Sequence, residues 1–192
     1  YILTVGGNTD NSGTMTQGSG LWTFTGTFTQ TAGTFTQGGS VSSNDVTASG
    51  GILALGAGTT WTCAGDWDTS GSTTTASTSL VVLSGAGKTL RIGNGGFYDL
   101  RLSGSITLQC DVWATDNLNV SGTLTQSTFK ANASGASTTA LRAKGSWDGD
   151  IYINGTGVKY NVQITAPFSA TGRIFTKANT TFFNSTIGNV TA

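Results

Sequence analysis

The sequence predicts an all-β fold, a right-handed parallel β-helix (β-solenoid) with almost no helix. Apolar and polar residues alternate along much of the chain, which is the period-two pattern of half-buried strands. Breaks of two to four small or polar residues interrupt the alternation, and they are too short for crossover helices. Such strands form either a β-meander or a coil wound around one core, and recurring motifs favour the coil.

The alternation is clearest in residues 98–125. Side chains of successive strand residues point to opposite faces, so one phase faces the core and the other faces solvent. The residues of the inward phase are predicted to be Leu100, Leu102, Ile106, Leu108, Cys110, Val112, Leu118, Val120 and Leu124.

The composition suits strands and tight corners better than helices. The 192 residues include 29 Gly, one Pro and no His, and all nine acidic residues are Asp. Residues that populate helix surfaces are scarce, whereas the abundant Thr and the Val, Ile and Phe favour pleated surfaces. The length allows a single domain over residues 1–192 with a core of its own.

Charge and motif content exclude several kinds of partner. The formal net charge is zero and only 9% of the residues are charged, so no basic patch is available for nucleic acid. No apolar run approaches the roughly 20 residues of a membrane span. A phosphate-loop motif is absent, and two Cys without His cannot complete a zinc site, so we expect no cofactor and no metal.

A short motif, Gly-Thr-x-Thr-Gln with a large apolar residue at x, recurs along the chain. Its copies occupy residues 13–17, 26–30, 33–37 and 122–126. The apolar residue lies between two Thr, so it is predicted to point inward while they point outward. Because the first copies follow one another closely, we expect them on successive sides of a coil.

A longer repeat is predicted from the similarity of residues 61–91 to residues 113–142. Each segment begins at a Trp and reaches a Leu-Arg pair, and an aromatic residue and a short strand follow. Self-similarity of about 40–50 residues is typical of solenoids and propellers. With about 20–25 residues in a coil, each long repeat would be two coils and the chain would make about eight.

Residues 97–125 resemble the repeats of right-handed parallel β-helix surface proteins, namely adhesin-like proteins of bacteria and archaea and segments of phage tail fibres. Those repeats combine an aromatic-x-Asp-Leu start, a Gly corner, a Thr-Leu strand, an Asp-Val pair and a Gly-Thr-Leu-Thr strand. Here these features stand at residues 97–100, 104, 107–108, 111–112 and 122–125. The resemblance covers about two thirds of the chain and implies a fold more strongly than a function.

Two pairs of Asp residues are the candidates for catalysis, since β-helix enzymes that degrade polysaccharides use clustered acidic and basic side chains. The pairs are Asp66 with Asp68 and Asp148 with Asp150, and both flank Gly and Trp. Asp in such a context caps a corner, so we expect structural roles. Without His a Ser-His-Asp triad is impossible, and the protein is predicted not to be an enzyme.

Both cysteines, Cys63 and Cys110, fall on the inward phase. They are about two coils apart along the axis, which exceeds the roughly 7 Å limit for bridged Cα atoms. Two buried thiols are therefore favoured, and a disulfide between coils is the alternative.

Two surface features bear on function. An ice-binding solenoid would stack Thr-x-Thr pairs on one flat face, but the pairs at 23/25, 27/29 and 34/36 are too close in sequence to lie one coil apart. Asn-x-Ser/Thr sequons make six Asn candidates for glycosylation on an archaeal or eukaryotic surface. These residues are Asn119, Asn132, Asn154, Asn179, Asn184 and Asn189.

The two ends of the sequence are apolar and β-prone, at residues 1–5 and 181–187. The exposed edge of a solenoid needs a cap, and no amphipathic cap helix is predicted. We expect the terminal strands to pair with neighbouring subunits or with the rest of a longer chain. The residues assigned to this assembly are Tyr1, Ile2, Leu3, Val5, Phe182, Phe183 and Ile187.

These observations predict a non-catalytic extracellular structural protein on a cell or virion surface. It would be the protomer of a head-to-tail surface filament or a segment of a long surface solenoid, so its partner is itself or the rest of that chain. The alternative is a phage tail-fibre or cell-surface adhesin module that binds surface glycans. A polysaccharide-degrading β-helix enzyme is the third hypothesis.

Overall fold

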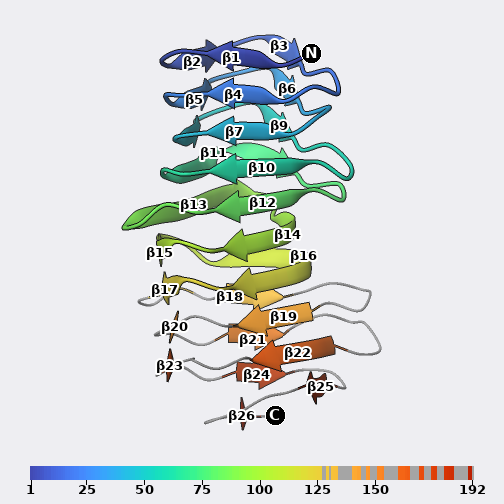
Figure 1. Cartoon of the computed structure of the whole chain (residues 1–192), viewed down its shortest axis with the longest axis vertical. Coiled ribbons are helices and arrows are strands. Elements are labelled where there is room, and N and C mark those ends of the chain that lie inside the picture. Colours follow the sequence, from blue (N-terminus) through green and yellow to red (C-terminus); the bar gives the residue numbers. More distant parts are fainter. Residues whose placement is uncertain are drawn as a thin grey trace.

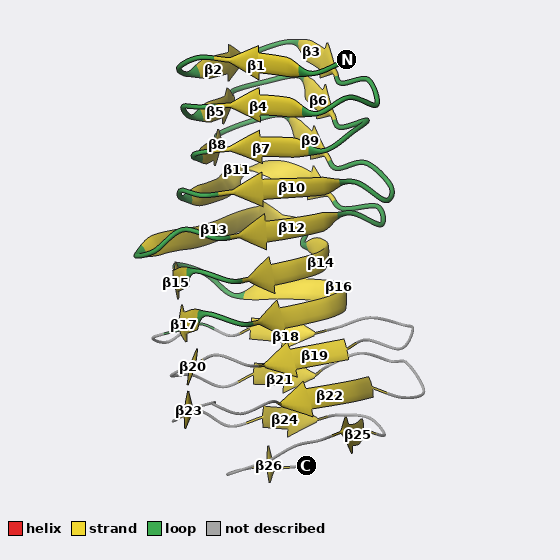
Figure 2. Ribbon diagram, viewed as in Figure 1, coloured by secondary structure: helices red, strands yellow, loops and turns green. Residues whose placement is uncertain are grey.

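The chain winds into a stack of parallel coils, as the ribbon views show (Figure 1, Figure 2). The computed structural model describes residues 1–126, 129, 131–133, 140–143, 146–147, 151–153, 160–164, 169–170, 174–176, 180–183 and 190–191. Every strand pairing is parallel, and the described residues contain no helix. The predicted parallel β-solenoid is thus confirmed.

Each turn of the coil has three sides, which we call faces A, B and C in the order in which the chain reaches them. Face A carries β1 (Leu3–Val5), β4 (Trp22–Phe24), β7 (Val41–Ser43), β10 (Thr60–Cys63), β12 (Leu80–Leu83), the end of β14 (Phe97–Leu102), the end of β16 (Val112–Val120), β19 (Ala140–Ala143), β22 (Tyr160–Ile164) and β25 (Thr180–Phe183).

Face B carries β2 (Thr9–Asn11), β5 (Phe28–Gln30), β8 (Val46–Ala48), the start of β11 (Trp67–Thr75), β13 (Lys88–Asn94), β15 (Ser105–Leu108), β17 (Thr123–Thr125), β20 (Ser146–Trp147) and β23 (Ser169–Ala170). Face C carries β3 (Thr14–Thr16), β6 (Thr34–Thr36), β9 (Ile52–Ala54), the end of β11, the starts of β14 and β16, β18 (Ala131–Ala133), β21 (Ile151–Ile153), β24 (Ile174–Thr176) and β26 (Val190–Thr191).

The strand register sets the length of a turn, and this length varies along the chain. Leu100 pairs with Leu118, whereas Trp67 pairs with Leu90, so the turn that starts at Trp67 is the longer of the two. Turns are on the whole shorter than the sequence predicted, and residues 1–126 form about six of them. The expected count of eight referred to the whole chain, beyond this range.

The core changes character along the axis. The first turns enclose a continuous row of aromatic rings whose neighbouring centroids lie between 5.0 and 6.3 Å apart, most of them edge to face. Aliphatic side chains fill the following turns. The aromatic row consists of Trp22, Phe24, Phe28, Phe35, Trp61, Trp67 and Phe97.

The predicted inward phase of residues 98–125 is confirmed, with one exception. All of its aliphatic residues are buried, whereas Cys110 is half-buried just beyond β15. Side chains of a strand alternate between its two faces, so once one residue is placed on the core face, the face of every other residue in that strand is fixed. Cys110 departs from the pattern because it follows the strand, where the chain already turns toward face C.

The short repeats lie only in part where they were predicted, since only the copies at 26–30 and 33–37 occupy successive sides and Met15 of the first copy is half-buried. Phe28 and Phe35 are buried between Thr residues on β5 and β6, two successive sides of one turn. The copy at 13–17 lies one turn earlier on the same face as the copy at 33–37. The Gln that ends each copy is buried, which the alternation did not reveal. These residues are Gln17, Gln30, Gln37 and Gln126.

The longer repeat is a wrong prediction. Trp61 is buried on face A, whereas Trp113 is only half-buried on face C. Likewise Leu90 lies on face B and Leu141 on face A. Since turns of unequal length separate the two segments, similar residues do not return to the same side of the coil.

Candidate functional site

Of the Asp residues proposed as corner caps, Asp66 lies at a corner, between β10 and β11, whereas Asp68 lies within β11. Asp66 follows β10, and its Oδ1 accepts hydrogen bonds from the backbone N–H of Thr89 (2.7 Å) and from its hydroxyl (3.0 Å). Asp68 Oδ1 accepts one from Ser70 N–H at 2.9 Å. The other pair, Asp148 and Asp150, lies outside the described residues. Through Asp66, the first pair links one turn to the next.

The two thiols are both free. Cys63 is buried, and its thiol lies 2.9 Å from the carbonyl oxygen of Asn44. Burial raises the pKa of Cys63 to about 11. Cys110 is half-buried, its sulfur accepts a hydrogen bond from Ile92 N–H at 3.1 Å, and burial raises its pKa as well. Neither environment favours a nucleophilic thiolate.

The Thr-x-Thr pairs singled out in the sequence lie on different faces, as predicted, in or beside β4, β5 and β6. Other pairs do share a face. On face C the register places 14/16, 34/36 and 73/75 in one array, which Ile52 and Ala54 interrupt. This array is outward-facing and is shorter and less regular than an unbroken Thr ladder.

Only one sequon has a described side chain. Asn119 is half-buried on the outer surface of β16. Asn132 lies in β18, of which the backbone alone is described. The remaining sequon residues, Asn154, Asn179, Asn184 and Asn189, lie outside the described residues.

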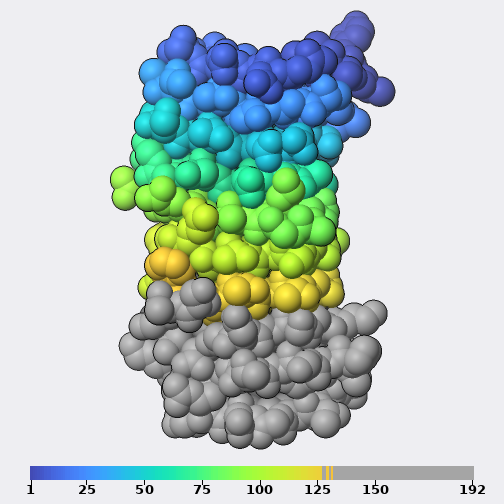
Figure 3. All heavy atoms as spheres, turned by 90° about the vertical axis from the view of Figure 1, so that its left-hand side faces the viewer, coloured from blue at the N-terminus to red at the C-terminus, as the bar shows by residue number. Residues whose placement is uncertain are grey.

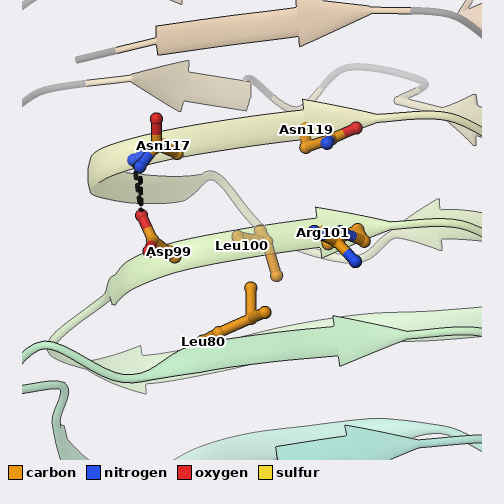
Figure 4. Close-up of a pocket in the computed structure, with 6 residues that line it drawn as sticks. All are labelled: Leu80, Asp99, Leu100, Arg101, Asn117 and Asn119. Atoms are coloured by element: carbon orange, nitrogen blue, oxygen red, sulfur yellow. Dashed lines mark hydrogen bonds between the residues drawn. The ribbon is translucent and has the colours of Figure 1, made fainter. Parts of the chain in front are cut away.

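A polar groove lies on the outer surface of face A, where β12, β14 and β16 run side by side (Figure 4). It has a volume of about 160 Å³, below the roughly 300–1,000 Å³ of ordinary ligand pockets. The register pairs Asp99 with Asn117 and Arg101 with Asn119, so these four residues are neighbours, two on β14 and two on β16. Leu80 of the preceding turn borders it beside Asp99.

Hydrogen bonds fix one side of this groove. Asp99 Oδ1 accepts from the backbone N–H of Asn117 (2.9 Å) and from its side-chain amide (2.7 Å). The same amide donates to Asp116 Oδ2 at 2.9 Å. The negative charge of Asp116, to which Tyr98 is also hydrogen-bonded, raises the pKa of Tyr98. The sequence alone did not reveal this site, because its residues come from three different turns.

The N-terminal end of the stack is an open edge. Strand β1 is the terminal strand of its sheet and pairs only with β4 among the described residues. Tyr1 is fully exposed, Ile2 is 77% exposed and Leu3 is 41% exposed. The first residues protrude from this end in the space-filling view (Figure 3).

The other residues assigned to assembly are less fully described. Val5 is half-buried in β1. Phe182 and Phe183 belong to β25, which pairs with β22 through its backbone. Ile187 lies outside the described residues. The described part of the predicted assembly surface is therefore the open edge at the N-terminal end.

The described part of the chain holds no helix long and apolar enough to cross a membrane. Among the same residues, no three His, Cys, Asp or Glu side chains gather as metal ligands would. Comparison with protein-family models, with curated proteins and with solved structures finds no match. The resemblance to β-helix repeat proteins therefore stands at the level of the fold.

Proposed function

We propose that the protein is a non-catalytic structural element of an extracellular surface, on a cell or a virion, and that its coils stack end to end with further coils. Those further coils belong to another copy or to the rest of a longer solenoid. The open N-terminal edge carries this proposal. A solenoid turn that lacks a neighbour leaves a row of backbone donors and acceptors together with its apolar interior.

The backbone of β1 has its free hydrogen-bonding groups directed away from the stack. Leu3 N–H donates to Leu21 C=O at 2.9 Å, and Val5 C=O accepts from Thr25 N–H at 3.1 Å. Groups of successive strand residues point to opposite edges, so the N–H and C=O of Thr4 point outward along the axis. A further parallel strand would pair with them by strand addition.

Side chains at this edge favour the same contact. Tyr1, Ile2 and Leu3 are exposed apolar residues, and each would contribute up to about 1.5–3 kcal/mol on burial. Natural edges are usually blocked by Lys, Pro or a covering helix. None of these stands in residues 1–5, and no described helix covers them.

The Asp contacts support the absence of catalysis in this proposal. Asp66 uses one oxygen to hold two groups of Thr89, and Asp68 lies 3.9 Å from Arg91 in an exposed ion pair. A glycoside-cleaving pair needs one carboxyl free to protonate the leaving group. Carboxylate oxygens that contact the neighbouring turn in this way are typical of a structural role.

Substitution of a single backbone donor tests the stacking. Thr4→Pro removes the outward N–H, while β1 keeps the Leu3 and Val5 bonds to the next turn. We expect the wild-type chain to form end-to-end oligomers or filaments, and the variant to remain a folded 19.5 kDa protomer. Sedimentation velocity and negative-stain electron microscopy measure the difference, and circular dichroism reports the fold.

Thr4→Val is the matched control, since it keeps the N–H and changes only an outward, exposed side chain. It should assemble like the wild type. A wild-type chain that stays monomeric at high concentration would refute stacking between copies and would leave the segment of a longer solenoid or the adhesin module. A Thr4→Pro variant that assembles as well as the control would show that the outward N–H of Thr4 is not part of the contact.

A further inference from the structure

The groove on face A joins four polar side chains that differ in hydrogen-bonding capacity. Asp99 only accepts, Arg101 only donates, and the amides of Asn117 and Asn119 do both. The carboxylate and the guanidinium stand two residues apart on β14, about 7 Å along the strand. Among the described residues no ion pair joins these two groups, so both retain capacity for a ligand.

The charges in and beside this groove restrict the ligand. Asp99 and Arg101 compensate each other, and the carboxylate of Asp116 lies beside them, hydrogen-bonded to Asn117, so an anionic ligand is disfavoured. A row of hydroxyl groups matches alternating acceptors and donors. Leu80 adds an apolar border against which carbon-bound hydrogens can pack.

The groove is already ordered before any ligand arrives. Asn117 is hydrogen-bonded to Asp99 (Figure 4) and also to Asp116, and these bonds orient the Asp99 carboxylate on the parallel ladder. Tyr98 adjoins the same corner, where it is half-buried and bonded to Asp116. Preorganised groups lose little conformational entropy on binding, which favours recognition by a shallow surface.

From these features we propose that the groove binds a neutral saccharide unit, with hydroxyl groups donating to Asp99 and accepting from Arg101 and Asn119. The volume of about 160 Å³ fits one sugar residue and leaves the rest of a glycan outside. Affinity for a single unit would be on the order of millimolar, given few atoms and an open site. This site is separate from the end-to-end contact, which lies several turns away.

Titration of the full chain with neutral disaccharides of glucose, galactose and N-acetylglucosamine tests the proposal. We expect at least one sugar to shift the NMR signals of the Asn117 and Asn119 side-chain amides. Arg101→Gln should weaken that binding about tenfold, because a charge-assisted hydrogen bond is lost. Inorganic phosphate, titrated in parallel, should leave both amide signals unchanged.

Arg91→Gln is the matched control, because Arg91 is an exposed arginine on face B that faces Asp68. It should bind sugar like the wild type. The proposal fails if no disaccharide shifts the two amides, if phosphate shifts them instead, or if both arginine variants lose affinity equally. Repeating the titration on Thr4→Pro separates sugar binding from assembly, since that variant leaves the groove intact.

Discussion

At the level of single residues, position in the strand period decides what a side chain contributes. Leu108 is buried in the core, while its neighbour Gln109 is exposed, although only one peptide bond separates them. Trp61 satisfies its buried indole N–H through Ser43 Oγ at 2.9 Å. Most buried polar atoms in proteins have such a partner, whereas the buried indole N–H of Trp67, in the same aromatic row, has none.

Replacement of a core leucine by a charge should therefore unfold the stack locally. Leu108→Asp would place an unpaired carboxylate among aliphatic neighbours, and we expect a loss of several kcal/mol in the free energy of unfolding. Gln109→Asp, one residue on, should change it by less than about 0.5 kcal/mol. Urea denaturation of the two variants gives the comparison, and equal midpoints would contradict the inward assignment of Leu108.

Cys63 predicts a loss of stability at alkaline pH. Its thiol pKa is raised from 9.0 to about 11 by burial, so between these values the unfolded chain ionises while the folded chain stays protonated. The stability is fully present below pH 9 and falls as the pH rises toward 11, by roughly 2–3 kcal/mol at about 1.36 kcal/mol per unit.

Denaturation midpoints across this pH range measure the effect, and Cys63→Ala provides the reference without a thiol. The difference between wild type and variant should shrink as the pH rises from 9 to 11. A difference that does not change with pH would show that Cys63 ionises equally in both states.

At the level of secondary-structure elements, the corners decide how closely turns can stack. Between faces A and B, glycines lie one above another: a Cβ on Gly104 would lie 1.9 Å from Gly85 O, and one on Gly122 would lie 1.9 Å from Gly104 O. Buried glutamines serve other corners. Gln37 Nε2 donates to Gly39 O (3.0 Å) and Thr60 O (3.2 Å), which joins two turns.

The glycine column yields a matched pair of variants. Gly104→Ala requires a backbone shift at a corner held between two turns, so we expect it to destabilise the protein by more than about 2 kcal/mol. Gly13→Ala meets no atom within 4 Å and should be neutral or slightly stabilising, because alanine restricts the unfolded chain. Thermal unfolding distinguishes them, and similar melting temperatures would mean that the corner relaxes freely.

At the level of the complete stack, each turn contacts only its neighbours, so the stability of an end depends on what covers it. The aromatic row lies nearest the open N-terminal edge, where Trp22 is half-buried. End-to-end stacking would complete the burial of this region. The stacking proposal accordingly has a second readout: the melting temperature of the wild type should rise with protein concentration, and that of Thr4→Pro should not.

The parallel β-solenoid and the inward residues of its strands could be predicted from the sequence, because an alternation of period two is a local property of the chain. The side of the coil that each strand occupies could not, because it depends on turn lengths that differ from one turn to the next. For this reason the long repeat failed while Leu100 and Leu118 were assigned correctly. The groove at Asp99 and Asn117 could not be predicted from the sequence either, because its residues come from successive turns and only the stacking of these turns brings them together.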